Sequence, residues 1–207
     1  MEQQQTTDEG PDAASAVSRG RAFRTAALAA SGAVVATAAI GAADRSDAAP
    51  SPEQDKRVLN LLLRVEYAEA AFYAAALDDA GLTGELEDFA RTVLAHEKEH
   101  VAFLKSALGD AADPEPSFDF GAVTADADAF AQAAAKLEDI AVGAYNGQAA
   151  NVTEGAFLAA ARIVSVEARH AAWIRSIRDA DPAPDAVDSP FDERRVRRGL
   201  RELGVQS

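Results

Sequence analysis

From Pro52 onward, apolar residues recur three, four and seven positions apart, the spacing of a helix with one buried face. Glycine and proline interrupt the pattern and divide it into segments. It predicts four long helices, near residues 53–80, 85–108, 124 to between 146 and 150, and 153–178. Short turns separate the first pair and the last pair, and a longer proline-containing connection separates the pairs. We expect an all-α, antiparallel four-helix bundle over residues 50–180, built from two hairpins joined by one crossover.

The C-terminal segment, residues 181–207, predicts an Asp- and Pro-rich linker followed by a short basic helix. Ser189-Pro190 is typical of a helix start, with proline at the first helical position. The helix carries five arginines, and its apolar residues share one face: Val196, Leu200 and Leu203. We expect it to dock on the acidic bundle of its own chain, and contact with a membrane or a partner is the alternative.

The N-terminal segment, residues 1–49, predicts a disordered tail and an export signal. The basic stretch Ser18–Arg24 precedes an Ala- and Gly-rich run that is too weakly hydrophobic for a membrane span. This layout resembles a twin-arginine signal, with Gly20 at the place of the first arginine of the pair. It predicts an exported protein (extracellular, periplasmic or cell-surface), cleaved after Ala43 or Ala49 and without a stable membrane span thereafter. An uncleaved amphipathic anchor is the alternative.

Composition narrows the possible chemistry. A formal charge of -14 argues against nucleic acid as a partner, because such binding needs a basic face. Cysteine is absent, which excludes disulfides, thiolate metal sites and a fused rubredoxin-type electron donor. The single methionine is residue 1. Any metal must therefore be held by carboxylate, imidazole, amide or hydroxyl groups.

The two hairpins repeat the same polar residues in the same order. These residues are Glu66, Tyr73, Glu97 and His100 in the first half, and Glu138, Tyr145, Glu167 and His170 in the second. The offset is 72 residues from Glu66 to Glu138 and 70 from Glu97 to Glu167. Four features aligned in order indicate a duplicated structural unit.

Each of the four repeated glutamates lies within an apolar helical stripe that should face the core. Four buried carboxylates would be very unfavourable alone, because an unpaired buried charge costs several kcal/mol and like charges repel. No lysine or arginine lies on these stripes. Two divalent cations would neutralise the four carboxylates. One Glu from each of two helices, with Glu-x-x-His from each of the other two, is the ligand set of di-iron and di-manganese bundles.

At this point the chain resembles the ferritin-like superfamily, over residues 53–178. The similarity is carried by Val65–Ala70, Glu97–Leu104 and Val166–His170. It extends to the exported branch of the superfamily, which includes the desiccation-related plant proteins.

The resemblance implies a role for each repeated residue. Glu66 and Glu138 would be terminal ligands, whereas Glu97 and Glu167 would bridge the two metals. His100 and His170 would each bind one metal. Tyr73 and Tyr145 would donate hydrogen bonds to the bridging carboxylates, and two ordinary core tyrosines are the alternative.

The segment 96–100 also matches the His-Glu-x-x-His motif of zinc metalloproteases. The longer metzincin pattern fails, because Phe103 and Ser106 replace its glycine and third histidine. A protease site would also leave the second Glu-x-x-His unexplained. We therefore treat His96 either as a partly exposed helix residue or as a neighbour of the metal centre.

Two further glutamates, Glu69 and Glu99, have no counterpart in the second half, where Ala141 and Arg169 occupy the matching positions. We expect both to lie on the surface or at the rim of the site rather than to bind metal.

Carboxylates with two imidazoles suit two iron or two manganese ions better than copper. A di-iron centre could bind oxygen or peroxide and oxidise ferrous iron, and a di-manganese centre could consume peroxide. The main alternative is a non-catalytic structural or stress-protection bundle. A homo-oligomer is compatible with either function.

Overall fold

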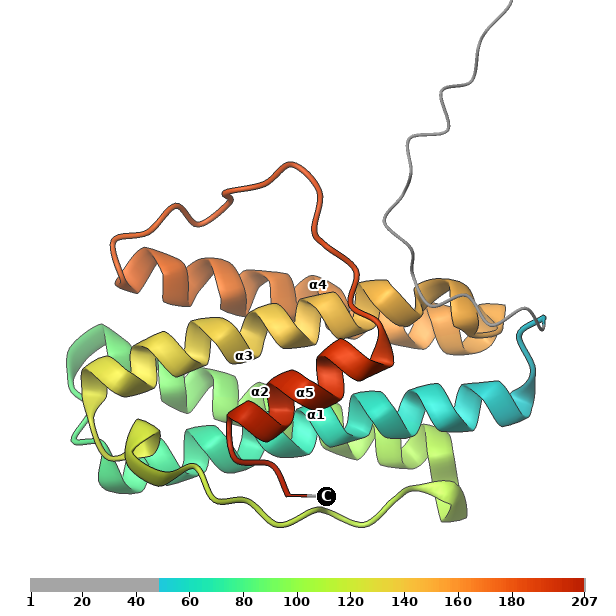
Figure 1. Cartoon of the computed structure of the whole chain (residues 1–207), viewed down its shortest axis with the longest axis horizontal. Helices are drawn as coiled ribbons and strands as arrows, with labels where there is room; N and C mark the ends of the chain where they lie inside the picture. Colours follow the sequence, from blue (N-terminus) through green and yellow to red (C-terminus); the bar gives the residue numbers. More distant parts are fainter. Residues whose placement is uncertain (1–48, 207) are drawn as a thin grey trace, which may run out of the picture. The chain divides into compact units, whose positions relative to one another are not determined.

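The computed structural model describes residues 49–206, so the expected export signal lies outside the described residues. The described chain contains four long helices: α1 (Pro52–Asp79), α2 (Gly84–Leu108), α3 (Ala127–Gln148) and α4 (Glu154–Ile177). A short helix, α5 (Glu193–Glu202), follows. Figure 1 shows the long helices packed side by side as a bundle, which confirms the expected fold class. No helix in this part of the chain is long and apolar enough to cross a membrane.

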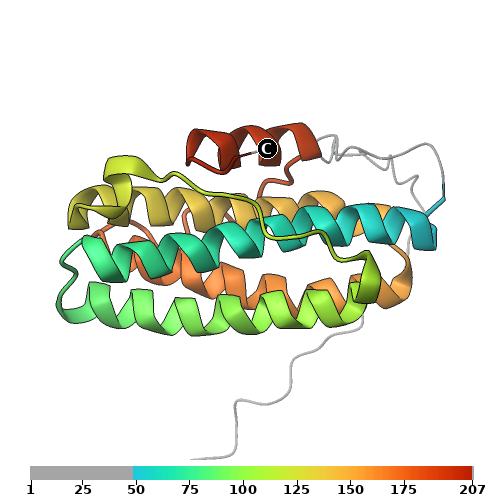
Figure 2. The ribbon, with the colours of Figure 1, turned by 90° about the horizontal axis from the view of Figure 1, so that it is seen from below.

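Helix α1 packs against α2, and α3 packs against α4, as the two predicted hairpins require. Figure 2 shows that α1 and α3 form one layer and that α2 and α4 form the other. The crossover runs from the end of α2 to the start of α3 and includes two short 3-10 turns, Gly109–Ala111 and Gly121–Thr124. All four helices therefore turn one face toward a common interior.

Local capping explains where the helices begin. The Ser51 hydroxyl accepts a hydrogen bond from the backbone N–H of Gln54 at 3.2 Å, ahead of Pro52 at the first helical position. The Asp126 carboxylate accepts one from the N–H of Ala129 at 2.8 Å. Helix α3 therefore begins at Ala127, three residues later than the expected start at Thr124.

The C-terminal helix starts later than Ser189-Pro190 predicts. Helix α5 begins at Glu193, because Asp192 caps it by accepting a hydrogen bond from the N–H of Arg195 at 2.6 Å. Just before the cap, the Phe191 N–H donates to the carbonyl of Gly143 at 2.8 Å. This contact fixes Phe191 against α3 directly ahead of Asp192, whose backbone is extended and which caps the helix.

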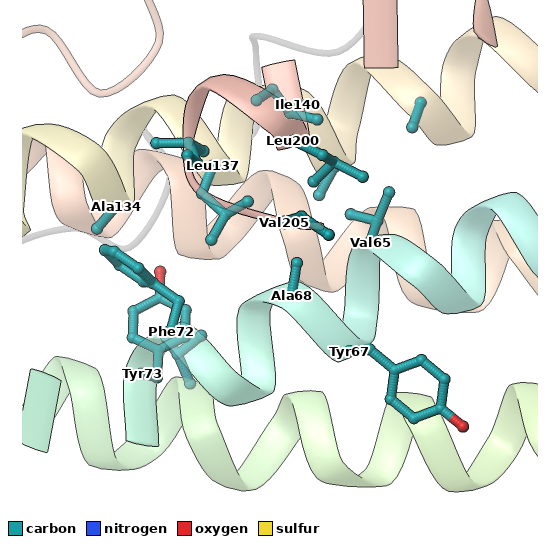
Figure 3. Close-up of a cluster of buried hydrophobic side chains, with 14 of the residues drawn as sticks. Val65, Tyr67, Ala68, Phe72, Tyr73, Ala134, Leu137, Ile140, Leu200 and Val205 are labelled. Atoms are coloured by element: carbon teal, nitrogen blue, oxygen red, sulfur yellow. The ribbon is translucent and has the colours of Figure 1, made fainter. Parts of the chain in front are cut away.

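Helix α5 docks on the bundle of its own chain, as expected, and its buried contacts are apolar, although at the surface its Glu202 also pairs with Lys136 of α3 at 3.8 Å. Figure 2 shows it on the outer side of the α1 and α3 layer. Arg197 pairs with Glu193 of its own helix at 2.7 Å. Figure 3 shows buried side chains where α1, α3 and the C-terminal segment meet: Val65, Ala68, Leu137, Ile140, Leu200 and Val205.

The chain end also pairs with the crossover. Phe118 and Val205 form an antiparallel bridge, in which the N–H of Asp119 donates to the carbonyl of Gly204 at 2.9 Å. Gly204 has φ +95°, and a Cβ at this position would lie 1.9 Å from the Asp119 carbonyl oxygen, so glycine is required. The C-terminal segment thus fastens the crossover to the bundle.

Gly147 of α3 gives a test of this packing. A Cβ at Gly147 would lie 1.8 Å from the Phe191 carbonyl oxygen. We expect Gly147→Ala to lower the free energy of unfolding by roughly 1–3 kcal/mol, measured by urea denaturation. Gly155→Ala is the control, because a Cβ at that glycine would have no heavy atom within 4 Å and alanine favours a helix. Equal stability of the two variants would contradict the packing described here.

Candidate metal centre

The bundle interior brings the six repeated ligand candidates together. Glu66 comes from α1 and Glu138 from α3, whereas α2 and α4 each contribute a glutamate and, one turn later, a histidine. Each of the four glutamates is fully buried, and His100 and His170 are 8% and 3% exposed. The apolar stripes of the sequence therefore do point inward, and they carry the carboxylates with them.

The first group of ligand atoms surrounds His100. Its Nδ1 lies 3.1 Å from Oε2 of Glu66 and 3.0 Å from Oε2 of Glu97. Oε1 of Glu167 is 2.9 Å from the same nitrogen. Ligand atoms of these four residues all lie within 4.8 Å of one another, a grouping that could hold a metal ion.

The second group surrounds His170. Its Nδ1 lies 3.1 Å from Oε1 of Glu97, and 3.5 Å from both Oε2 of Glu138 and Oε2 of Glu167. Glu97 and Glu167 therefore direct one oxygen toward each histidine. Two carboxylates shared between two imidazole-centred groups are the arrangement that bridging ligands would need.

The tyrosines contact different carboxylates from those that the resemblance implies. Tyr73 of α1 donates a hydrogen bond to Glu138 of α3, and Tyr145 of α3 donates one to Glu66 of α1. Neither acceptor belongs to the bridging pair. Each tyrosine lies two turns beyond the glutamate of its own helix, so it reaches the facing helix of the same layer. The two bonds cross-link α1 and α3 reciprocally, as the repeat would suggest.

Comparison with known protein families matches residues 54–180, more than half of the chain, to the ferritin-like domain. The chain belongs to this family. No curated protein matches the chain. The matched residues include the whole of the buried Glu and His cluster and end before α5.

The cluster of this ferritin-like domain is rich in unpartnered acceptors. Four buried carboxylate oxygens have no hydrogen-bond donor: Oε1 of Glu97, Oε2 of Glu138 and both oxygens of Glu167. Nδ1 of His170 is also unpartnered, although it lies close to three carboxylates. Buried polar atoms are normally hydrogen-bonded. Carboxylate oxygens that converge without hydrogen-bond donors suit a bound cation. These side chains, taken as metal ligands, therefore suit a di-metal site.

In the metal-free cluster, burial and the neighbouring charges shift the pKa values of the glutamates and histidines. Burial raises the pKa of Glu66 well above its usual range and raises that of Glu138 to about 8. Burial alone would lower the pKa of His100 and His170, but the three carboxylates around each raise it to about 12. Burial raises the pKa of Glu97, but the imidazoles of His100 and His170, 3.0 and 3.1 Å from its two oxygens, lower it to about 2. Without metal, protonated imidazoles take the place of the cations.

The tyrosine hydroxyls remain donors throughout. Burial raises the pKa of Tyr73 and Tyr145 well above 10, and the adjacent carboxylates raise it further. Each hydroxyl therefore fixes one oxygen of Glu138 or Glu66 and leaves the other oxygen free to face the histidine of its group.

Glu69 contradicts the expectation from the sequence. Its lack of a counterpart predicts a place at the surface or rim, but it is fully buried. Its offset of three residues from Glu66 and four from Tyr73 places it on the same inward stripe of α1, and this signal is present in the sequence. Glu99, by contrast, is exposed as expected.

His96 is both an exposed helix residue and a neighbour of the centre. Its Nδ1 lies 2.8 Å from Nε2 of His170, on the side of that ring away from the carboxylates. It belongs to neither group of ligand atoms. A zinc site built from His96 and His100 would need both rings to face one point, and here they contact different groups.

Metal binding by this domain should strengthen with pH. Because His100 and His170 are protonated below a pKa of about 12 in the metal-free state, metal must displace protons from them at neutral pH. We expect the apparent Kd for Mn²⁺ to fall by at least about tenfold per pH unit between roughly pH 6 and 8. Competition with a fluorescent chelator measures this, with circular dichroism to verify that the helices persist. A pH-independent Kd would show that metal binding does not displace protons from the imidazoles.

Proposed function

We propose that this ferritin-like domain binds two iron or two manganese ions and, with iron, acts as an oxidoreductase that oxidises ferrous iron or consumes peroxide. The observation that carries the proposal is the sharing of Glu97 and Glu167 between two groups, each with its own histidine. Glu66 and His100 would complete one metal position, and Glu138 and His170 the other. A site for a single ion would not need two bridging carboxylates.

The metal would supply the electrons: a ferrous pair gives up two, enough to reduce one hydrogen peroxide molecule, with two protons, to two water molecules. The protein residues supply the setting. Tyr73 and Tyr145 hold Glu138 and Glu66 in place, and the buried walls exclude bulk water. No lysine or arginine is buried among the described residues, so the protons on His100 and His170 are the internal positive charge that bound metals would displace.

A hollow at the surface borders the centre at His100, and we propose it as the route for small reactants. It has a volume of about 240 Å³ and is lined by Glu99, His100, Phe103, Arg162 and Ile163. His100 is therefore at once a candidate ligand and part of the protein surface. The Arg162 guanidinium lies over the Phe103 ring, 5.3 Å from its centroid. Oxygen and hydrogen peroxide are small, uncharged molecules that could use such an opening.

Metal content tests the proposal directly. We expect about two iron or manganese ions per chain, one for each group of ligand atoms, when the protein is purified without a metal-binding tag and measured by mass spectrometry. Glu97→Ala and His170→Ala should reduce the content to one ion or none and abolish ferrous oxidation. Asp88→Ala is the matched control, because it removes an exposed carboxylate from the same helix and does not line the hollow.

Other outcomes would favour other functions. One zinc ion that is lost in His96→Ala but retained in Glu138→Ala would indicate a protease-type site. Two metals that stabilise the fold without any turnover would indicate a structural or stress-protection bundle, as in the desiccation-related branch. No metal after loading would contradict the di-metal proposal itself.

We further propose that the protein is exported. The basic stretch Ser18–Arg24 and the weakly apolar run after it support this, and a twin-arginine-type route would suit a protein that folds around metal before transport. Expression in a host with that route should release a mature chain outside the cytoplasm that begins after Ala43 or Ala49. N-terminal sequencing identifies the cleavage site, and Arg21→Ala with Arg19→Ala should keep the full-length chain inside.

A further inference from the structure

Basic side chains gather on the outer side of α1, where α5 and the crossover pack against it (Figure 2). Two hollows open there, with volumes of about 310 and 220 Å³. We call them together the basic groove, because five cationic side chains line them: Lys56, Arg57 and Arg64 of α1, and Arg197 and Arg201 of α5. Among the described residues, only two carboxylates line the same space, those of Asp113 and Glu193. The net charge of the chain is -14, so this surface differs in sign from the protein as a whole.

The two hollows of the groove are joined. Arg64 and Arg197 line both of them, so these side chains lie where one hollow meets the other. The charge of Arg197 acts unfavourably on Arg64, whereas that of Asp113 acts favourably. On α1, the step from Lys56 to Arg64 corresponds to a rise of roughly 12 Å along the helix. The positive charge is therefore spread along the groove rather than gathered at one point.

Contacts that do not involve these cations hold the walls of the groove in place. The Asn60 side chain of α1 donates to the carbonyl of Ala111 at 2.8 Å and accepts from the N–H of Asp113 at 2.7 Å. The Gln206 N–H donates to the carbonyl of Ser117 at 2.9 Å, beyond the end of α5. The groove is thus formed before any ligand enters, which lowers the ordering cost of binding.

The cations of the groove are poorly matched by carboxylates. Of the five, only Arg197 forms an ion pair within the described part of the chain, with Glu193 at 2.7 Å. Arg57 and Arg64 donate hydrogen bonds to uncharged amide oxygens instead. At physiological ionic strength, charges more than about 8 Å away are largely screened, so the nearby cations outweigh the distant acidic residues. Guanidinium groups make strong, bidentate hydrogen bonds to phosphate oxygens.

We propose that the basic groove binds a soluble anion that carries two or more linked phosphate groups. One phosphate lies between Arg64 and Arg197, where the hollows meet, and the next extends along the groove toward Arg57 or Arg201. The ligand is a soluble molecule rather than a lipid surface, because the space is recessed between α1, the crossover and α5. The proposal does not depend on the di-metal function, whose candidate ligand on α1, Glu66, is fully buried on the inner side of that helix.

Isothermal titration calorimetry with sodium tripolyphosphate tests the proposal. The full chain is first freed of metal with a chelator, so that phosphate cannot bind through a metal ion. We expect saturable binding at about 0.15 M salt that weakens as the salt concentration rises. Inorganic phosphate should bind more weakly, because it reaches fewer of the five cations.

Two double variants of α5 with the same change in charge localise the binding. Arg197→Gln with Arg201→Gln removes two cations of the groove, and we expect the affinity for tripolyphosphate to fall at least about tenfold. Arg194→Gln with Arg198→Gln is the control, because it removes two exposed arginines of the same helix that do not line the groove. Circular dichroism verifies the fold of each variant. Arg57→Gln is a third variant, which should weaken binding from the α1 side without altering α5.

Three outcomes would overturn the inference. Equal losses of affinity in the two α5 variants would show that binding follows net charge and not the groove. Inorganic phosphate bound as tightly as tripolyphosphate would exclude a ligand of linked phosphates. Cosedimentation with phosphatidylglycerol vesicles, but not with phosphatidylcholine vesicles, in the absence of tripolyphosphate binding would assign the groove to a lipid surface. None of these results would affect the di-metal function, which metal content tests separately.

Discussion

The structure depends on the burial of like-charged carboxylates in an apolar helical bundle. Four glutamates from four helices meet in the interior, and protonated imidazoles are the only cations within that cluster in the metal-free protein. A hydrophobic core would be stable without these groups, so burial of the cluster opposes folding, and bound metal ions would offset that cost. The helices, their caps and the tyrosine bonds hold together charges that would otherwise separate in water.

The repeat gives the centre an approximate twofold relation that is broken in a few places. Tyr73 and Tyr145 form reciprocal hydrogen bonds between α1 and α3, and Glu97 and Glu167 each direct one oxygen toward each histidine. Glu69 occurs only on the α1 side, and His96 contacts only His170. The two metal positions would therefore differ in charge and in hydrogen bonding, which allows the two ions to differ in their chemistry.

Much of this arrangement could be predicted from the sequence, because helical periodicity alone decides which side chains share a face. That rule places Glu66, Glu97, Glu138 and Glu167 in the interior together. Comparison of the two halves wrongly predicts a surface or rim position for Glu69, because a residue without a counterpart in the other half can still face the interior. The hydrogen-bond acceptors of the tyrosines depend on distances between helices, and the start of α5 depends on the packing of Phe191 against α3. Neither is encoded in local sequence.

The C-terminal segment has a consequence for how quickly a bound metal could leave. Each hairpin carries half of the candidate ligands, so separation of the hairpins would open the whole centre. Helix α5 contacts both α1 and α3, and the Phe118–Val205 bridge ties the chain end to the crossover. Separation of the hairpins must first release this segment, which makes its local unfolding a kinetic gate on exchange. The residence time of a bound metal would then depend in part on contacts on the far side of α1 and α3, away from the candidate ligands.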